Sequence, residues 1–190
     1  MGCGVAPAAG SRWNRRMTGD ETNRVLYIIT CAAGPAPGVG TLIDLARAEG
    51  WRVHLIATPS AVAFLDLDAI EARLGGPVFS EYRRPDEVKR QPPADAAVVA
   101  PGTYNTINKW AAGIADNYAL GTLAELTGQG VPIALLPCVN DNLAANRVYA
   151  RSLDELREAG VRVLRSPRQA GEGGPLLDGF PWQSALDAVR

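Results

Sequence analysis

The 190-residue sequence is poor in the residue types that mark several common classes of protein. It has one histidine, His54, and three cysteines, Cys3, Cys31 and Cys138, none of which lies in a CxxC pair. An odd, widely spaced set of cysteines indicates neither a disulfide framework nor a zinc site. We therefore expect no bound metal, and a reducing cytoplasm is the simplest location for such a chain.

Long apolar runs and basic runs are also scarce. Residues 1–22 contain no continuous apolar segment of signal-peptide or membrane-spanning type, and Ala6 stands where a myristoylation signal needs Ser or Thr. Beyond the short stretch SRWNRRM there is no basic run, and the formal net charge is -1. We expect no membrane and no nucleic-acid partner. Residues 1–22, which show no periodicity, are predicted to be a flexible tail before one domain of residues 23–190.

From Arg24 onward, apolar runs of strand length alternate with segments of helical period. The runs are near-continuous, which is typical of parallel strands buried on both faces, and they cover residues 25–30, 53–58, 96–101, 131–137 and 161–166. The helical segments, which each end at a glycine suited to a C-cap, cover residues 40–50, 106–130 and 140–160. This order predicts a single α/β domain of the doubly wound, Rossmann-like type, with a parallel sheet and helices on both faces.

A glycine-rich connection, TCAAGPAPGVGT at residues 30–41, follows the first predicted strand. It lacks the third glycine of GxGxxG and the Gly-Lys of a P-loop, which disfavours a dinucleotide or nucleoside-triphosphate site. Its backbone N–H groups could still hold a single phosphate at the start of a helix. A plain connection between strand and helix explains the segment equally well.

The third predicted strand changes abruptly into small and hydrogen-bonding residues at Pro101. In the stretch VVAPGTYNTINKWAAGIADN, residues 98–117, glycine, threonine and asparagine precede any charge. Such residues are common in turns and helix caps. At the carboxyl end of a parallel strand, they also lie where open α/β sheets bind their ligands.

Three segments together resemble one family, the homo-oligomeric flavin-containing cysteine decarboxylases, which includes lantibiotic-peptide decarboxylases and phosphopantothenoylcysteine decarboxylase. PGTYNTINKWAAGIADN resembles the family's PASANT motif and the helix after it. PCVNDNLA resembles its PxMNxxMW substrate segment, and VLYIITCAAG resembles its amino-terminal VTGSIAA stretch. The order and spacing match from about Arg24 to Leu164.

The resemblance implies flavin mononucleotide (FMN) as the cofactor and a homo-oligomer, a trimer or a multiple of trimers, with Trp110 and Tyr118 as candidate interface residues. The positions that it assigns to flavin binding are Cys31, Ala32, Ala33, Thr58, Ser60, Thr103, Tyr104, Asn105, Thr106 and, through its backbone, Cys138. Small residues and scattered hydroxyls suit a cofactor with one phosphate and a planar ring. Asn140 corresponds to the asparagine that binds the carboxyl end of the substrate.

The chain departs from the family pattern at the catalytic histidine. An ungapped count places Glu87 there, beside Asp86, so the candidate catalytic residues are Asn105, Asn140 and Glu87. His54 lies inside a predicted strand, where a hydrogen-bonded or partly buried structural role is expected. Near the carboxyl end, Ala170 stands where phosphopantothenoylcysteine decarboxylases carry a reducing cysteine.

These features predict an FMN-binding flavoprotein, a divergent flavin-dependent oxidoreductase or decarboxylase. Its expected substrate is a small carboxylate-bearing or cysteine-like molecule, or the carboxyl end of a peptide. A non-catalytic FMN-binding or regulatory protein of the same fold is the alternative, and a relative that kept the fold but lost the flavin is a third. The asparagines at positions 105 and 140 favour an enzyme. The missing histidine favours the regulatory protein.

Overall fold

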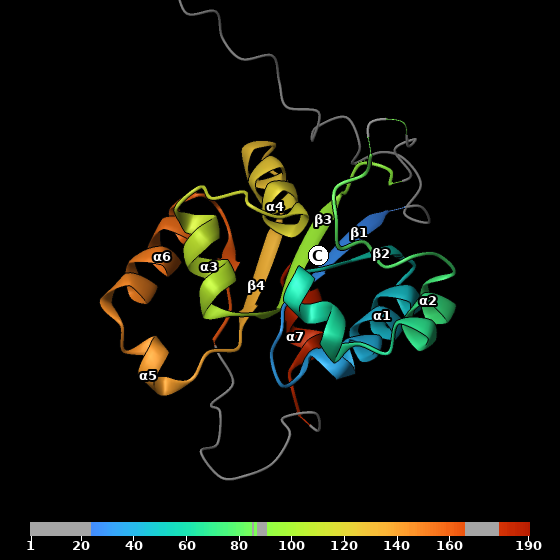
Figure 1. The fold of residues 1–190 in the computed structure, drawn as a ribbon, viewed down its shortest axis with the longest axis horizontal. Coiled ribbons are helices and arrows are strands. Elements are labelled where there is room, and N and C mark those ends of the chain that lie inside the picture. The colour runs from blue at the N-terminus through green and yellow to red at the C-terminus, as the bar shows by residue number, and fades with distance from the viewer. Residues whose placement is uncertain (1–23, 85, 87–90, 166–178) are drawn as a thin grey trace, which may run out of the picture.

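The computed structural model describes residues 24–84, 86, 91–165 and 179–190 (Figure 1). Five parallel strands form one sheet in the order β2-β1-β3-β4-β5. The strands are β1 (Val25–Thr30), β2 (Arg52–Ala57), β3 (Ala96–Gly102), β4 (Ile133–Pro137) and β5 (Arg162–Val163). The predicted Rossmann-like α/β class is therefore confirmed.

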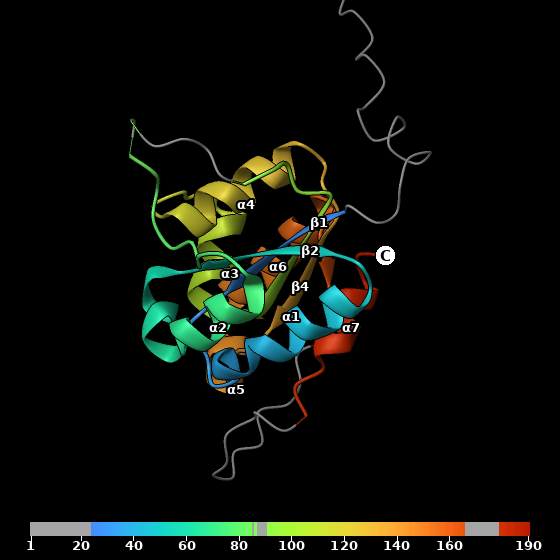
Figure 2. The same cartoon turned by 90° about the vertical axis from the view of Figure 1, so that its right-hand side faces the viewer.

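Helices cover both faces of this sheet, as predicted. On one face lie α1 (Val39–Ala48), α2 (Leu67–Leu74) and α7 (Trp182–Asp187), and on the other lie α3 (Tyr104–Ala111), α4 (Tyr118–Gly128) and α6 (Arg147–Glu158). Short helical turns, η3 (Ala36–Gly38), η4 (Pro59–Phe64) and α5 (Asp141–Ala144), follow β1, β2 and β4. Figure 1 shows α3 and α6 on one side of the strands and α1 and α2 on the other, and Figure 2 shows α4 above the strands with α1, α2 and α7 below them.

The near-continuous apolar strands are explained by burial on both faces. In β1, Leu26 and Ile28 pack in the core beneath α1 and α7, whereas Tyr27 and Ile29 pack in the core beneath α3, α4 and α6. Because successive side chains of a strand point to opposite faces, a strand between two helical layers needs apolar residues at every position. All six residues of β1 are buried.

The predicted continuous helix over residues 106–130 is wrong. The structure has two helices there, because α3 ends at Ala111 and Gly113 adopts a left-handed conformation with φ of 71°. Asn117 then caps α4, its side-chain oxygen accepting a hydrogen bond from the backbone N–H of Leu120 at 3.0 Å. An asparagine cap after a left-handed glycine starts a new helix rather than continuing the old one.

The predicted helix over residues 140–160 is likewise divided, because Asn146 caps α6 by accepting a hydrogen bond from the N–H of Val148. The fifth strand is shorter than predicted and has only two residues. The glycines placed at helix ends were predicted correctly, since Gly50, Gly130 and Gly160 all have positive φ. None of the helices in the described residues has the length and apolar character needed to cross a membrane.

Candidate functional site

The sheet reverses its order next to β1, and this reversal locates the candidate site. β1 lies between β2 and β3, so the chain leaves its carboxyl end toward one neighbour and returns to the other. In open α/β sheets, such a switch point leaves a crevice at the carboxyl ends of the strands, where ligands bind. The four segments predicted to contact flavin follow β1, β2, β3 and β4 at this edge.

Three backbone hydrogen bonds join these four segments. The N–H of Cys31 donates to the carbonyl of Pro101 at 3.1 Å, and the N–H of Thr58 donates to the carbonyl of Thr30 at 3.0 Å. The N–H of Cys138 donates to the carbonyl of Gly102 at 2.8 Å. The structure therefore brings together the loops after all four strands.

The amino-terminal end of α3 offers backbone donors at this edge. Thr103 precedes the helix, but its hydroxyl makes no capping hydrogen bond and instead lies 3.1 Å from the hydroxyl of Thr106. The first N–H to find a helical acceptor is that of Ile107, which donates to the carbonyl of Thr103. The preceding N–H groups of α3 remain available to an anion, which the helix dipole also favours at this end.

A second uncapped helix start lies after β1. Gly38 precedes α1 and has no side chain to cap it. Thr30, the last residue of β1, is fully buried and its hydroxyl has no hydrogen-bond partner among the described residues. Buried hydroxyls almost always have a partner, so this one is a polar group at the end of β1 that the described residues leave unsatisfied. Thr30 is not among the predicted flavin positions, although a polar residue that ends an apolar strand is a usable signal.

Cys31 is placed beneath the site rather than in it. The residue is fully buried, and burial raises the pKa of its thiol, while hydrogen bonds from the side chains of Thr106 and Thr103 lower it in part. A buried, protonated thiol is a poor nucleophile. Cys31 therefore serves to position the two threonines, and the half-buried Ala32 and Ala33 after it leave room for a ligand to approach the backbone.

The other predicted flavin positions contribute in different ways. Thr58 is buried and Ser60 is exposed at the start of η4. The ring of Tyr104 stacks on that of Tyr149 of α6, with ring centroids 6.0 Å apart, so its side chain belongs to the packing between α3 and α6. Cys138 is 4% exposed, so its backbone rather than its side chain faces any ligand at this edge, and its role toward flavin stays a prediction.

Two asparagine side chains are exposed at this edge. Asn140 caps α5 by accepting a hydrogen bond from the N–H of Leu143 at 2.9 Å, which leaves its amide NH₂ group as a donor. Asn105 lies in the first turn of α3, and its side chain has no partner among the described residues. Both amides can therefore donate to an anionic ligand group.

The candidate base is not placed by the structure, because Glu87, like Ala170, lies outside the described residues. The neighbouring Asp86 is exposed in a turn. His54 lies within β2, between the rings of Tyr27 and Phe79, and not at the carboxyl edge. Burial and the charge of Arg52 lower the pKa of His54. No cluster of three possible metal ligands occurs in the part of the chain that the structure describes.

Several solved structures share this fold, among them an FMN-dependent cysteine decarboxylase and an FMN binding protein. MrsD from Bacillus sp. HIL-Y85/54728 is 18% identical, with a TM-score of 0.70 over 89% of this chain and 95% of that one. The FMN-dependent cysteine decarboxylase SpaF is 22% identical, with a TM-score of 0.68 over 90% of this chain and 99% of that one. The FMN binding protein AtHal3 is 25% identical, with a TM-score of 0.60 over 80% of this chain and 87% of that one.

Curated relatives are named coenzyme A biosynthesis bifunctional protein CoaBC. The protein of Mycolicibacterium smegmatis is 28% identical over 142 residues, which are 71% of this chain and 34% of the relative. That of Thermococcus kodakarensis is 25% identical over 129 residues, which are 65% of this chain and 32% of the relative. The matched part therefore spans about a third of the length of these relatives.

The flavoprotein family model matches residues 14–175, which is most of the chain. The strand order, the donors at the carboxyl edge and the similar structures agree with this match. A flavin is the class of cofactor that these findings support. The chain belongs to the flavoprotein family.

Proposed function

We propose that this protein binds FMN at the carboxyl edge of the sheet and is a divergent flavin-dependent oxidoreductase or decarboxylase. Its substrate is a small carboxylate-bearing or cysteine-like molecule, or the carboxyl end of a peptide. The observation that carries this proposal is the set of donors at the carboxyl edge that have no partner among the described residues, the first N–H groups of α3 and the amide of Asn105, in a chain of the flavoprotein family.

The donors of the site fit a phosphate monoester. The free N–H groups of α3 and the hydroxyls of Thr103, Thr58 and Ser60 would hold the phosphate without a lysine or arginine. Ala32 and Ala33 leave space for a planar ring close to the backbone. A bound flavin supplies two-electron oxidation, which the side chains of this protein cannot provide.

The residues of this chain would bind and orient the substrate. The amide NH₂ of Asn140 donates to a substrate carboxylate, because its oxygen is already committed to the N–H of Leu143. Asn105 offers a second free amide from the first turn of α3. A general base typically contributes about a hundredfold to ten-thousandfold in rate. Without the family histidine, we expect slow turnover of phosphopantothenoylcysteine or none.

The alternative function is a non-catalytic FMN-binding or regulatory protein, and the missing histidine is the observation that favours it. For either function we propose a homo-oligomer, a trimer or a multiple of trimers. Trp110 is 5% exposed and its ring N–H donates to the hydroxyl of Thr127, so it stabilises the monomer core. The exposed apolar residues available to an interface include Phe64, Ile114 and Leu143.

Absorption spectroscopy of the purified protein tests cofactor binding. We expect the visible bands of a bound flavin, which mass spectrometry of the released cofactor identifies as FMN. Incubation with phosphopantothenoylcysteine, followed by measurement of carbon dioxide, then separates an efficient enzyme from a slow or inactive protein. A colourless protein that fails to bind added FMN would refute the proposal. Turnover equal to that of a pathway enzyme would show that another group replaces the histidine.

A further inference from the structure

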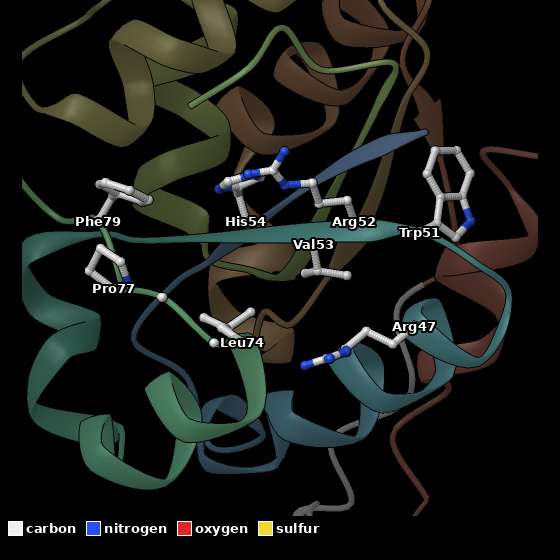
Figure 3. Close-up of a pocket in the computed structure, with 10 residues that line it drawn as sticks. Arg47, Trp51, Arg52, Val53, His54, Leu74, Pro77 and Phe79 are labelled. Carbon is white, nitrogen blue, oxygen red and sulfur yellow. The ribbon is translucent and has the colours of Figure 1, made fainter. Parts of the chain in front are cut away.

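A cavity of about 330 Å³, here called the β2 cavity, lies along the first half of β2 (Figure 3). It is bounded by the end of α1, by β2 and by the chain that follows α2. That chain runs along the edge of β2, since the backbone of Phe79 donates to the carbonyl of Leu55 and accepts from the N–H of Ala57. The flavin, in contrast, is placed at the loops after the strands. The β2 cavity is therefore a second concave site, of a size that suits a small organic molecule.

The lining of the β2 cavity carries positive charge that no carboxylate of the described residues offsets. Arg47 of α1 and Arg52 of β2 both line it, and neither forms an ion pair with a residue of the described ranges. Asp44, one turn before Arg47 on α1, pairs instead with Arg73 of α2. No described aspartate or glutamate lines the cavity. An anion would supply the counter-charge that both arginines lack.

The two arginines reach this one cavity from different elements. In Figure 3, Arg47 rises from α1 toward the lower side of the β2 ribbon, and Arg52 extends over its upper side next to His54. Both arginines are exposed, so their long side chains are free to turn toward one acidic group. His54 also lines the cavity, and its buried Nε2 atom has no partner among the described residues. The lining thus offers an anion two guanidinium groups and an imidazole.

The rest of the lining is apolar and includes Val53, Leu74, Pro77 and Phe79. A bare inorganic ion would leave most of the 330 Å³ to water, since one water molecule takes up only about 30 Å³ of the liquid. A ligand with an apolar body beside its acidic group would instead cover these side chains, which is favourable because it removes apolar surface from water. Charge and shape together therefore favour an organic anion over a simple ion.

We propose that the β2 cavity binds a small organic anion, which carries a carboxylate or phosphate group on an apolar ring or chain. The acidic group binds Arg47 and Arg52, because a guanidinium donates two parallel hydrogen bonds to either kind of group. The apolar body lies against Leu74, Pro77 and Phe79. This site does not depend on the proposed flavin site, since the two have no lining residue in common.

Fluorine NMR of para-fluorophenyl phosphate, titrated with the full-length protein, tests this proposal. We expect saturable line broadening with a dissociation constant below about 1 mM. Arg47→Gln and Arg52→Gln should each weaken binding about fivefold, which corresponds to about 1 kcal/mol for a partly exposed ion pair. The neutral para-fluorobenzyl alcohol, which loses both pairs, should bind about twentyfold more weakly. Arg151→Gln, on the opposite helical layer, should change nothing.

Para-fluorobenzoate is the parallel probe for a carboxylate, and the tighter of the two anionic probes identifies the acidic group. Filling the cavity tests the place of the apolar body. Gly76 lines the cavity, and nothing lies within 4 Å of a Cβ atom added there, so Gly76→Leu should take up part of the space and weaken binding. Gly128→Leu, at an equally open position on α4, is the matched control and should bind the probe normally.

Several results would overturn the proposal. Unchanged binding in both arginine variants, equal affinity for the neutral alcohol, or no saturation by either anionic probe at about 10 mM would exclude an anion site. Inorganic phosphate that competes as well as para-fluorophenyl phosphate would show that the cavity takes only a simple ion. Binding that is lost in Asn105→Leu but kept in both arginine variants would assign the probe to the proposed flavin site.

Discussion

The hydroxyl oxygens of Thr103 and Thr106 lie 3.1 Å apart, and both side chains hydrogen-bond to the buried thiol of Cys31. This contact links the start of α3 to the loop after β1, two of the segments that we assign to flavin binding. It fixes the first turn of α3 without using a hydroxyl as a helix cap, so the backbone N–H groups stay free for a ligand.

Thr106→Val is expected to weaken FMN binding about fivefold, because it removes the hydroxyl that positions Thr103, at a cost of about 1 kcal/mol. Titration of the flavin-free protein with FMN, followed by quenching of flavin fluorescence, measures the change. The control is Thr127→Val, which removes the hydroxyl that accepts a hydrogen bond from Trp110. The control should lower stability but leave the FMN affinity unchanged, and an equal loss in both variants would contradict our placement of the phosphate.

Asn105→Leu should lower flavin occupancy as purified, since an exposed amide in the first turn of α3 is replaced by an apolar side chain that cannot donate. The ratio of visible to ultraviolet absorbance reports the occupancy. Gln129→Leu, on the exposed end of α4, is the matched control. Unchanged occupancy in the Asn105 variant would remove this residue from the site.

Gly102→Ala should destabilise the protein by about 1–3 kcal/mol, the usual cost of forcing an extra carbon into a packed core. A Cβ atom on Gly102 would lie 2.5 Å from Cδ1 of Leu135 in the neighbouring strand. Urea unfolding of the flavin-free protein measures the free energy. Gly34→Ala is the control, because nothing lies within 4 Å of its added Cβ, and its stability should be close to that of the wild type.

The stability of the protein should fall between pH 10 and pH 12 in a way that depends on Tyr27. Burial raises the pKa of this phenol to about 12, and its hydroxyl donates to the carbonyl of Pro92 at 2.7 Å. The unfolded chain loses the phenolic proton near pH 10, whereas the folded chain keeps it to a higher pH. The contribution of Tyr27 to the free energy of unfolding is therefore complete below pH 10 and is lost as the pH rises to 12.

Tyr27→Phe removes this linkage. The free energy of unfolding of the wild type should therefore fall by up to about 1.4 kcal/mol per pH unit more steeply than that of the variant across this window. Denaturant unfolding at several pH values measures both slopes. Parallel slopes would show that Tyr27 ionises normally in the folded protein.

The sequence determined the parallel α/β class and the four loops of the candidate site. Strands such as β1 are buried on both faces and must be apolar at every position, so their pattern is readable without the fold. Likewise, glycines with positive φ at positions 50, 130 and 160 mark helix ends by a local backbone requirement. Both the apolar pattern and the glycine positions can be recognised from residues that are adjacent in the sequence.

Only the tertiary structure decided how the candidate residues are used. The ring of Tyr104 could have faced the ligand, but Tyr149 of α6, 45 residues later, stacks on it. The hydroxyl of Thr30 is buried with no partner among the described residues, because β2 and β3 lie on either side of β1. Such contacts join residues far apart in the chain, so side-chain packing and strand order, rather than local sequence, determine them.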